Sequence, residues 1–137
     1  MTTVDFGNGL TTLDTDAFYY GRNLQSVDLP ATVTNIGRAF GLCWNIQYVI
    51  VRAVNPPVLA DGDAFPYSYP IYVPAESIDD YKIETNWVSI TSRLFPFVGS
   101  VADLSGIDTT VYTQAAVVIG KQITQYQYNN GQWEVIQ

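Results

Sequence analysis

Residues 24–43 of this 137-residue chain read Leu-Gln-Ser-Val-Asp-Leu-Pro-Ala-Thr-Val-Thr-Asn-Ile-Gly-Arg-Ala-Phe-Gly-Leu-Cys, and this stretch decides the predicted fold. Within it, Val27-Asp28-Leu29 is apolar, variable, apolar, which is typical of a short strand with two buried side chains and one exposed. Pro30 follows directly and ends the predicted strand, because proline removes a backbone N–H from the ladder.

The same triplet recurs along the chain at intervals of 22 or 23 residues. Its four copies are Val4-Asp5-Phe6, Val27-Asp28-Leu29, Val49-Ile50-Val51 and Ile71-Tyr72-Val73. An Ala-Phe pair also recurs between the triplets, at Ala17-Phe18, Ala39-Phe40 and, less regularly, Ala64-Phe65. Units this short cannot bury their own apolar face, so stacked units must share one core. The repeat therefore predicts a mainly β solenoid.

The unit 24–43 is similar over its whole length to the BspA-like bacterial leucine-rich repeats, whose pattern is LxxVxLPxxVxxIGxxAFxxC. The first unit departs from that pattern by having Gly21 at the cysteine position. The third unit, 49–69, is degenerate, because Pro56-Pro57 and Asp61-Gly62-Asp63 replace its middle. The resemblance covers about residues 4–97 and implies a leucine-rich-repeat solenoid of about three to four repeats.

The segment 72–87 resembles the C-terminal closure of such repeat proteins, in which a final strand is followed by a short helix. The resemblance implies that Ile78, Tyr81 and either Ile83 or Trp87 cover the last repeat. A cap of this kind is needed because an end repeat otherwise exposes the edge of the core. Residues 1–97 are thus expected to form one capped solenoid domain.

The remaining chain divides into an expected linker and an expected antiparallel β meander. Residues 98–110 are rich in Gly, Ser, Asp and Thr, which is typical of a linker. Residues 111–137 contain three predicted strands, 115–119, 122–128 and 132–136, with a hairpin signal at Asn130-Gly131. So small a meander has little core alone, so it docks on the solenoid, on a second copy or on another protein. Tyr126, Tyr128 and Trp133 are the candidates for an assembly contact.

Two surfaces are candidates for binding. The first is the outward face of the predicted strands, where tyrosine offers a large contact area with few torsions. Its candidate residues are Asp5, Asp28, Tyr48, Ile50 and Tyr72. The alternative is that the tail covers Tyr48, Ile50 and Tyr72. The second surface lies on the turns after the Ala-Phe pairs and comprises Tyr19, Tyr20 and Trp44.

Composition argues against catalysis and against several partners. A net charge of −7 with six basic residues disfavours nucleic acid and anionic membranes. No histidine is present to act as a general base or metal ligand, and Cys43 occupies the repeat's own cysteine position. The D-x-D pairs Asp14/Asp16 and Asp61/Asp63 provide too few oxygens for calcium and are interpreted as solvated turns. We expect no enzyme activity, no cofactor and no metal.

The expected function is therefore binding or assembly, with two possible settings. The resemblance implies adhesion at a bacterial surface through protein or glycan contact, and then an extracellular or cell-surface location. The other hypothesis is a bacteriophage virion protein, a head or tail decoration or fibre, whose meander attaches it or makes it oligomeric. The first residues lack the profile of a secretory signal, and no apolar run is long enough to span a membrane.

Overall fold

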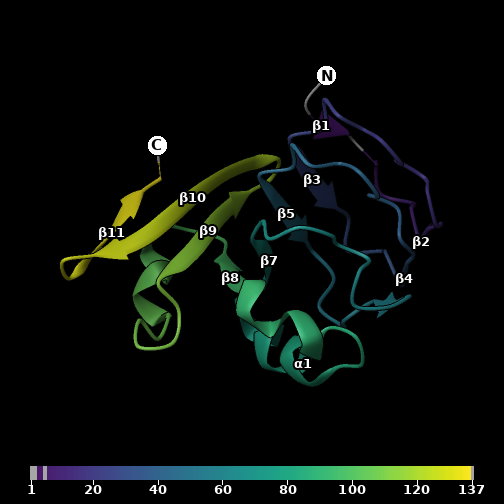
Figure 1. The fold of residues 1–137 in the computed structure, drawn as a ribbon. Helices are drawn as coiled ribbons and strands as arrows, with labels where there is room; N and C mark the ends of the chain where they lie inside the picture. The colour runs from purple at the N-terminus through teal and green to yellow at the C-terminus, as the bar shows by residue number, and fades with distance from the viewer. Residues whose placement is uncertain (1–2, 5, 137) are drawn as a thin grey trace.

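The computed structural model describes residues 3–4 and 6–136, and it is mainly β, as the repeat predicts. The described strands form an eight-stranded sheet, in the order β1-β3-β5-β7-β8-β9-β10-β11, and a three-stranded sheet, in the order β2-β4-β6. Figure 1 shows the second sheet at one side of the molecule and the last strands of the large sheet at the other.

The chain alternates between the two sheets through its first half. The large-sheet strands β1 (Thr3–Val4), β3 (Ser26–Leu29), β5 (Tyr48–Val51) and β7 (Ile71–Pro74) are parallel, as are the small-sheet strands β2 (Thr12–Leu13), β4 (Asn35–Ile36) and β6 (Val58–Leu59). The predicted strands at 27–29, 49–51 and 71–73 are confirmed, and that at 4–6 reaches only Val4 among described residues. We call residues 3–25, 26–47 and 48–70 the first, second and third circuits.

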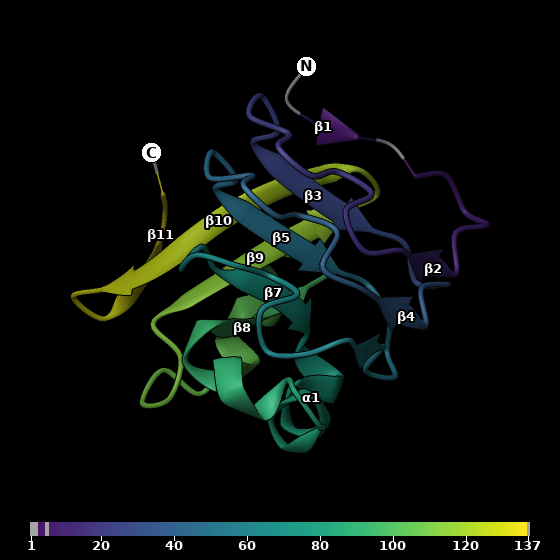
Figure 2. The same ribbon diagram turned by 45° about the vertical axis from the view of Figure 1, so that its right-hand side comes forward.

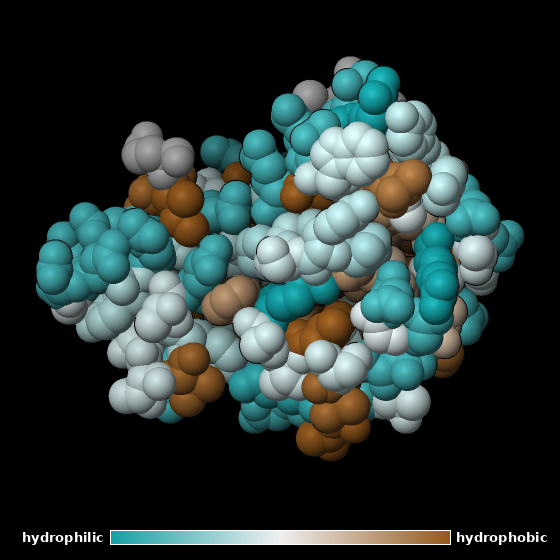
Figure 3. All heavy atoms as spheres, viewed as in Figure 1, coloured by the Kyte–Doolittle hydropathy of each residue, from teal (hydrophilic) through white to brown (hydrophobic). Residues whose placement is uncertain are grey.

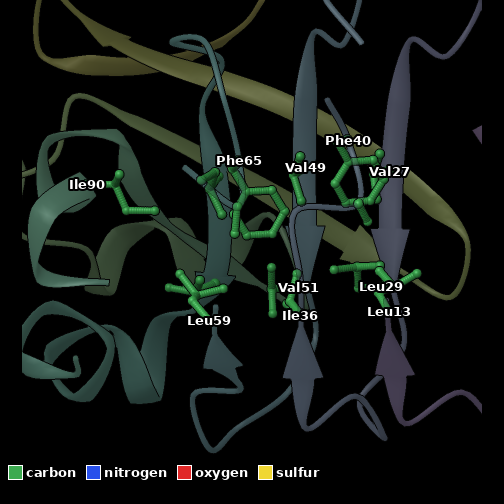
Figure 4. Close-up of a cluster of buried hydrophobic side chains, with 14 of the residues drawn as sticks. Leu13, Val27, Leu29, Ile36, Phe40, Val49, Val51, Leu59, Phe65 and Ile90 are labelled. Carbon is green, nitrogen blue, oxygen red and sulfur yellow. The ribbon is translucent and has the colours of Figure 1, made fainter. Parts of the chain in front are cut away.

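The side chains between the two sheets form one continuous core. Figure 4 shows Val27, Leu29, Val49 and Val51 of the large sheet gathered with side chains of the small sheet, which are Leu13, Ile36 and Leu59. Beside them, aromatic rings stack along the molecule, with centroid distances of 5.7, 5.9 and 5.9 Å between successive members of the series Phe18, Phe40, Phe65 and Trp87. The core is continuous because equivalent positions of the repeat lie next to one another.

A helical segment closes the far end of this core. It comprises η1 (Ala75–Ser77), α1 (Ile78–Ile83) and η2 (Val88–Arg93). Ile78, Tyr81 and Trp87 are buried, whereas Ile83 is 80% exposed. Trp87 Nε1 donates to the carbonyl of Pro57 at 2.7 Å, and the Tyr81 hydroxyl donates to the carbonyl of Ala53. A short helix therefore follows the last repeat strand, as predicted, and it is hydrogen-bonded to the third circuit.

The connection to the meander is packed against the fold. β8 (Leu94–Val98) lies parallel to β7 and to β9 (Gln114–Ile119), so the chain must cross over between β8 and β9. The crossover contains η3 (Ala102–Gly106), and Leu104 of η3 is buried against Ala115 and Val117. The segment 98–110, expected to be a linker, thus begins in a strand and contributes a side chain to a small core.

The meander itself is as predicted to within one residue at each strand end. β9 pairs antiparallel with β10 (Gln122–Asn129), and β10 pairs with β11 (Gln132–Val135). Asn130 and Gly131 both have positive φ, 53° and 82°, as the Asn-Gly hairpin signal requires. Figure 2 shows β9 and β10 passing behind β3, β5 and β7. The meander therefore docks on the chain's own sheet.

Candidate interaction surfaces

The outward face of β5 and β7 is covered, which corrects the first candidate binding surface. Ile50 and Tyr72 are both 0% exposed and form a cluster with Ala116 and Val118 of β9. They were expected to be contact residues because the strand pattern places them outward. They do point outward from the repeat core, but the hairpin formed by β9 and β10 lies over them. The alternative left open by the sequence, a tail over this face, is what the structure has.

Tyr72 anchors the hairpin through hydrogen bonds as well as through packing. Its hydroxyl donates to Gln125 Oε1 at 2.9 Å and accepts from Gln114 Nε2 at 3.2 Å. Burial raises the pKa of Tyr72 above its usual range. The phenol therefore stays neutral and remains a hydrogen-bond donor to the tail. Tyr48 is half-buried beside it, with ring centroids 6.4 Å apart.

Asp28 is also engaged inside the molecule. Its two carboxylate oxygens accept from Arg52 at 2.7 and 2.9 Å, and Arg52 donates further to the carbonyl of Gly120 at 2.5 Å. The hydrogen bonds that Arg52 donates to Asp28 raise the pKa of Arg52. Gly120 is the first residue of the turn between β9 and β10, so this pair fastens the hairpin tip. The remaining candidate on this face, Asp5, lies outside the described residues.

A signal in the sequence could have indicated that this face is covered. The run Ala115-Ala116-Val117-Val118 is apolar at every position, which is typical of a strand buried on both faces. Ala116 and Val118 pack on the repeat sheet, and Ala115 and Val117 pack on Leu104. A strand with two buried faces needs two partners, and the repeat sheet was the largest apolar surface available.

The second candidate surface is exposed. Tyr19, Tyr20 and Trp44 have exposed fractions of 56%, 49% and 46%. Tyr20 and Trp44 pack edge to face at 5.7 Å, and the Tyr20 backbone N–H donates to the carbonyl of Gly41 at 2.7 Å. A Cβ atom added at Gly41 would lie 2.9 Å from the Tyr19 ring, so a larger residue there would require the Tyr19 side chain to shift. The structure thus brings the three predicted residues onto two adjacent turns.

Two further exposed residues occupy the position equivalent to Tyr20 on the next turns, and the sequence analysis missed both. They are Leu42 and Tyr67, each two residues after a ladder phenylalanine. Tyr20, Leu42 and Tyr67 have positive φ values of 65°, 57° and 73°. Residues with a Cβ adopt this region rarely, at a cost of roughly 1–3 kcal/mol each. We call these exposed residues, Tyr19, Tyr20, Leu42, Trp44 and Tyr67, the aromatic turn edge.

The tail aromatics pack largely within the molecule. Tyr128 and Trp133 lie edge to face across the β10–β11 pair at 5.2 Å. Tyr126 and Trp133 pack against the cluster that contains Leu104. All three side chains are half-buried. Figure 3 shows that the most hydrophobic residues on the viewed face lie in separate groups, with polar and intermediate residues between them.

The Cys43 thiol and the Asp61 carboxylate are both hydrogen-bonded within the molecule. Cys43 is fully buried, its Sγ donates to the carbonyl of Phe18 at 3.0 Å, and burial raises the pKa of its thiol. Asp61 accepts from Arg38 at 2.6 Å, and its pKa is lowered first by the backbone N–H of Asp63 and then by Arg38. Within residues 3–4 and 6–136, no group of three or more acidic or cysteine side chains could hold a metal ion.

No helix in the described part of the chain has the length and hydrophobicity needed to cross a bilayer. No protein-family model matches this chain, and a search of curated proteins finds no relative.

Proposed function

We propose that this chain is a surface-exposed, non-catalytic binding module whose repeat region is a short leucine-rich-repeat solenoid of the BspA-like type. Three observations support the proposed fold. The parallel strands recur at the spacing of the repeat, the Ala-Phe phenylalanines stack in a ladder, and Cys43 fills a buried position between turns. The proposed setting is extracellular or at a cell surface, with protein or glycan as partner.

The observation that carries the proposed function is the aromatic turn edge. Repeat proteins commonly bind through an open surface of stacked turns. Here the outward face of β5 and β7 is occupied by β9 and β10, whereas the exposed turns remain open to a partner. Tyrosine and tryptophan dominate binding energy at many interfaces, because they bury large area with few torsions to fix. The turns hold Tyr20 and Tyr67 at positive φ, which fixes the backbone that presents these side chains.

The test is a binding screen of the full chain on glycan and peptide arrays, with a matched pair of variants. Trp44→Ala removes an exposed tryptophan from the edge, and Val58→Ala removes an exposed valine from β6 of the small sheet. We expect the Trp44→Ala variant to lose binding to the array ligands that the wild type binds. The Val58→Ala variant should still bind them. Equal binding by all three proteins, or no retained ligand for the wild type, would contradict the proposal.

A second candidate function, assembly within a virion, is supported by the edge of the large sheet. Among the described strands, β11 pairs only with β10, and Val135 on β11 is exposed. An open edge strand without lysine or proline invites pairing with another chain. Light scattering of the full chain would test this function. An oligomer that Val135→Lys dissociates and Val58→Lys leaves intact supports assembly, and a monomeric wild type contradicts it.

A further inference from the structure

A cavity of about 310 Å³ opens at the first circuit, next to the aromatic turn edge. Its floor is apolar and is formed by Val4, Phe18 and Leu24, and its rim carries Tyr20, Arg22 and Asn23. This volume is at the small end of ligand sites, so it suits one side chain of a larger partner.

The cavity lies at a turn that has Gly21 where the equivalent turn of the next circuit has Cys43. In the second circuit, the buried Cys43 side chain fills the space under the turn and bonds to the carbonyl of Phe18. In the first circuit, the equivalent residue is Gly21, which has no side chain. A Cβ atom there would lie 3.1 Å from the Phe18 carbonyl and 3.3 Å from Cys43 Sγ. The Gly21 position itself is therefore tightly packed, and glycine lets the turn close against Cys43 while the cavity opens beside it, next to Leu24.

The rim of the cavity carries a cation that no anionic side chain of the described residues neutralises. The guanidinium of Arg22 lies 4.9 Å from the centre of the Tyr20 ring, and within the described residues it has no carboxylate or carbonyl partner. The other arginines are engaged, since Arg38 and Arg52 pair with aspartates and Arg93 donates to two carbonyls. In a chain of net charge −7, an arginine with no acidic partner in the described part of the chain is suited to a carboxylate ligand.

The character of the cavity favours a peptide over a sugar. The aliphatic and aromatic side chains Val4, Phe18 and Leu24 match an apolar side chain of a peptide better than the hydroxyl groups of a sugar. Val4 also belongs to β1, which pairs only with β3 among the described strands, so its outer edge can accept a further strand. Adding a peptide strand to a sheet edge, with one side chain in a pocket, is a common recognition mode.

We infer that the first circuit binds an extended acidic peptide, which places one apolar side chain in this cavity and a carboxylate on Arg22. The inference rests on the proposed function, since it specifies a partner for one end of the aromatic turn edge. Tyr20 serves both parts, because its ring forms a wall of the cavity and holds the guanidinium in place.

The experiment is a calorimetric titration of the full chain with a hexapeptide of alternating aspartate and leucine. Arg22→Gln should weaken binding by up to about fivefold, because an ion pair on an exposed arginine is largely screened by solvent. Arg38→Gln is the matched control and should bind like the wild type, since Arg38 is exposed but engaged with Asp61. Replacing leucine by alanine in the peptide should weaken binding roughly tenfold or more.

Other outcomes would overturn the inference and are distinguishable from failure of the proposed function. Equal affinity for Arg22→Gln, equal affinity for a lysine–leucine peptide, or no heat at millimolar peptide would each contradict it. A trimer of galacturonic acid supplies carboxylates without an apolar side chain. If this sugar binds in a Trp44-dependent way and the peptide does not, the inference is wrong and the proposed function stands. If the array screen also retains no ligand, both are wrong.

Discussion

The two ends of the repeat core are finished in different ways. At the far end, Trp87 completes the aromatic ladder and is fully buried beneath α1 and η2. At the near end, Phe6 packs edge to face on Phe18 at 5.5 Å and remains half-buried, as do Val4 and Leu10. The same ladder therefore ends in a sealed layer on one side and in an accessible layer on the other.

This difference teaches that stability and recognition are separated along the axis of the repeat. The sealed end contributes buried area and buried hydrogen bonds to stability. Substitutions there are therefore expected to be destabilising. The described residues of the other end, Val4, Phe6 and Leu10, are only half-buried, and the cavity and Arg22 lie there. Local stability is commonly lowest where proteins bind ligands. Substitutions at equivalent ladder positions at the two ends test this separation directly.

The largest effect is expected from Trp87→Ala at the sealed end. The change removes a fully buried ring and leaves the carbonyl of Pro57 without its donor. We expect the free energy of unfolding to fall by about 3–5 kcal/mol, measured by urea denaturation. Trp44→Ala, which removes a half-exposed ring, is the control and should cost far less. Equal losses for the two variants would contradict the idea of a sealed end.

A smaller effect is expected from Tyr81→Phe, which removes only a hydroxyl from the same layer. The hydroxyl is buried and donates to the carbonyl of Ala53, so the carbonyl would be left without a partner. The expected loss is about 1–3 kcal/mol in the free energy of unfolding. Tyr19→Phe removes an exposed hydroxyl and should leave the urea midpoint unchanged. A neutral Tyr81→Phe would mean that this hydrogen bond adds nothing to the stability of the cap.

At the accessible end, Phe6→Ala should cost about 1 kcal/mol, close to the average for point substitutions. Phe6 is half-buried and contacts the ladder through one ring edge, so less area and less cavity are at stake than at Trp87. Thermal denaturation of Phe6→Ala and Trp87→Ala in the same buffer gives the comparison. A loss at Phe6 as large as that at Trp87 would show that the near end is sealed too.

The smallest effect is expected from Ile83→Lys on the outer side of α1. Ile83 is 80% exposed, so the free energy of unfolding should change by no more than about 0.5 kcal/mol. This variant separates the two sides of the helix, because Ile78 and Tyr81 on its other side are buried. A large loss in urea denaturation would indicate that Ile83 also contacts the fold.

Much of the fold could be predicted because each repeat unit carries its strand pattern in a short stretch of sequence. The spacing of Val27, Val49 and Ile71 locates three parallel strands, and Asn130-Gly131 locates the last hairpin. The docking of the hairpin could not be predicted in the same way. It depends on parallel pairing of β8 with β9 across a crossover, and pairing between distant segments leaves no periodic trace.

For the candidate sites, the sequence likewise predicts local features but not contacts between distant segments. The strand pattern correctly indicates that Ile50 and Tyr72 point away from the repeat core, but a period of two does not say what covers that side. Tyr19, Tyr20 and Trp44 are exposed as expected, since they follow the buried Phe18 and Phe40 on tight turns. Arg22 was not singled out, because its lack of a partner becomes visible only when every other arginine has been placed.

The buried Cys43 can report how often this part of the molecule opens. It is the chain's single cysteine, it lies at the junction of the first two circuits, and its thiol is both covered and held protonated by burial. A thiol-reactive dye can modify it only when that junction opens and the thiolate forms. The labelling rate therefore reports how often the contact between the first and second circuits opens. A partner bound to the first circuit would lower this rate.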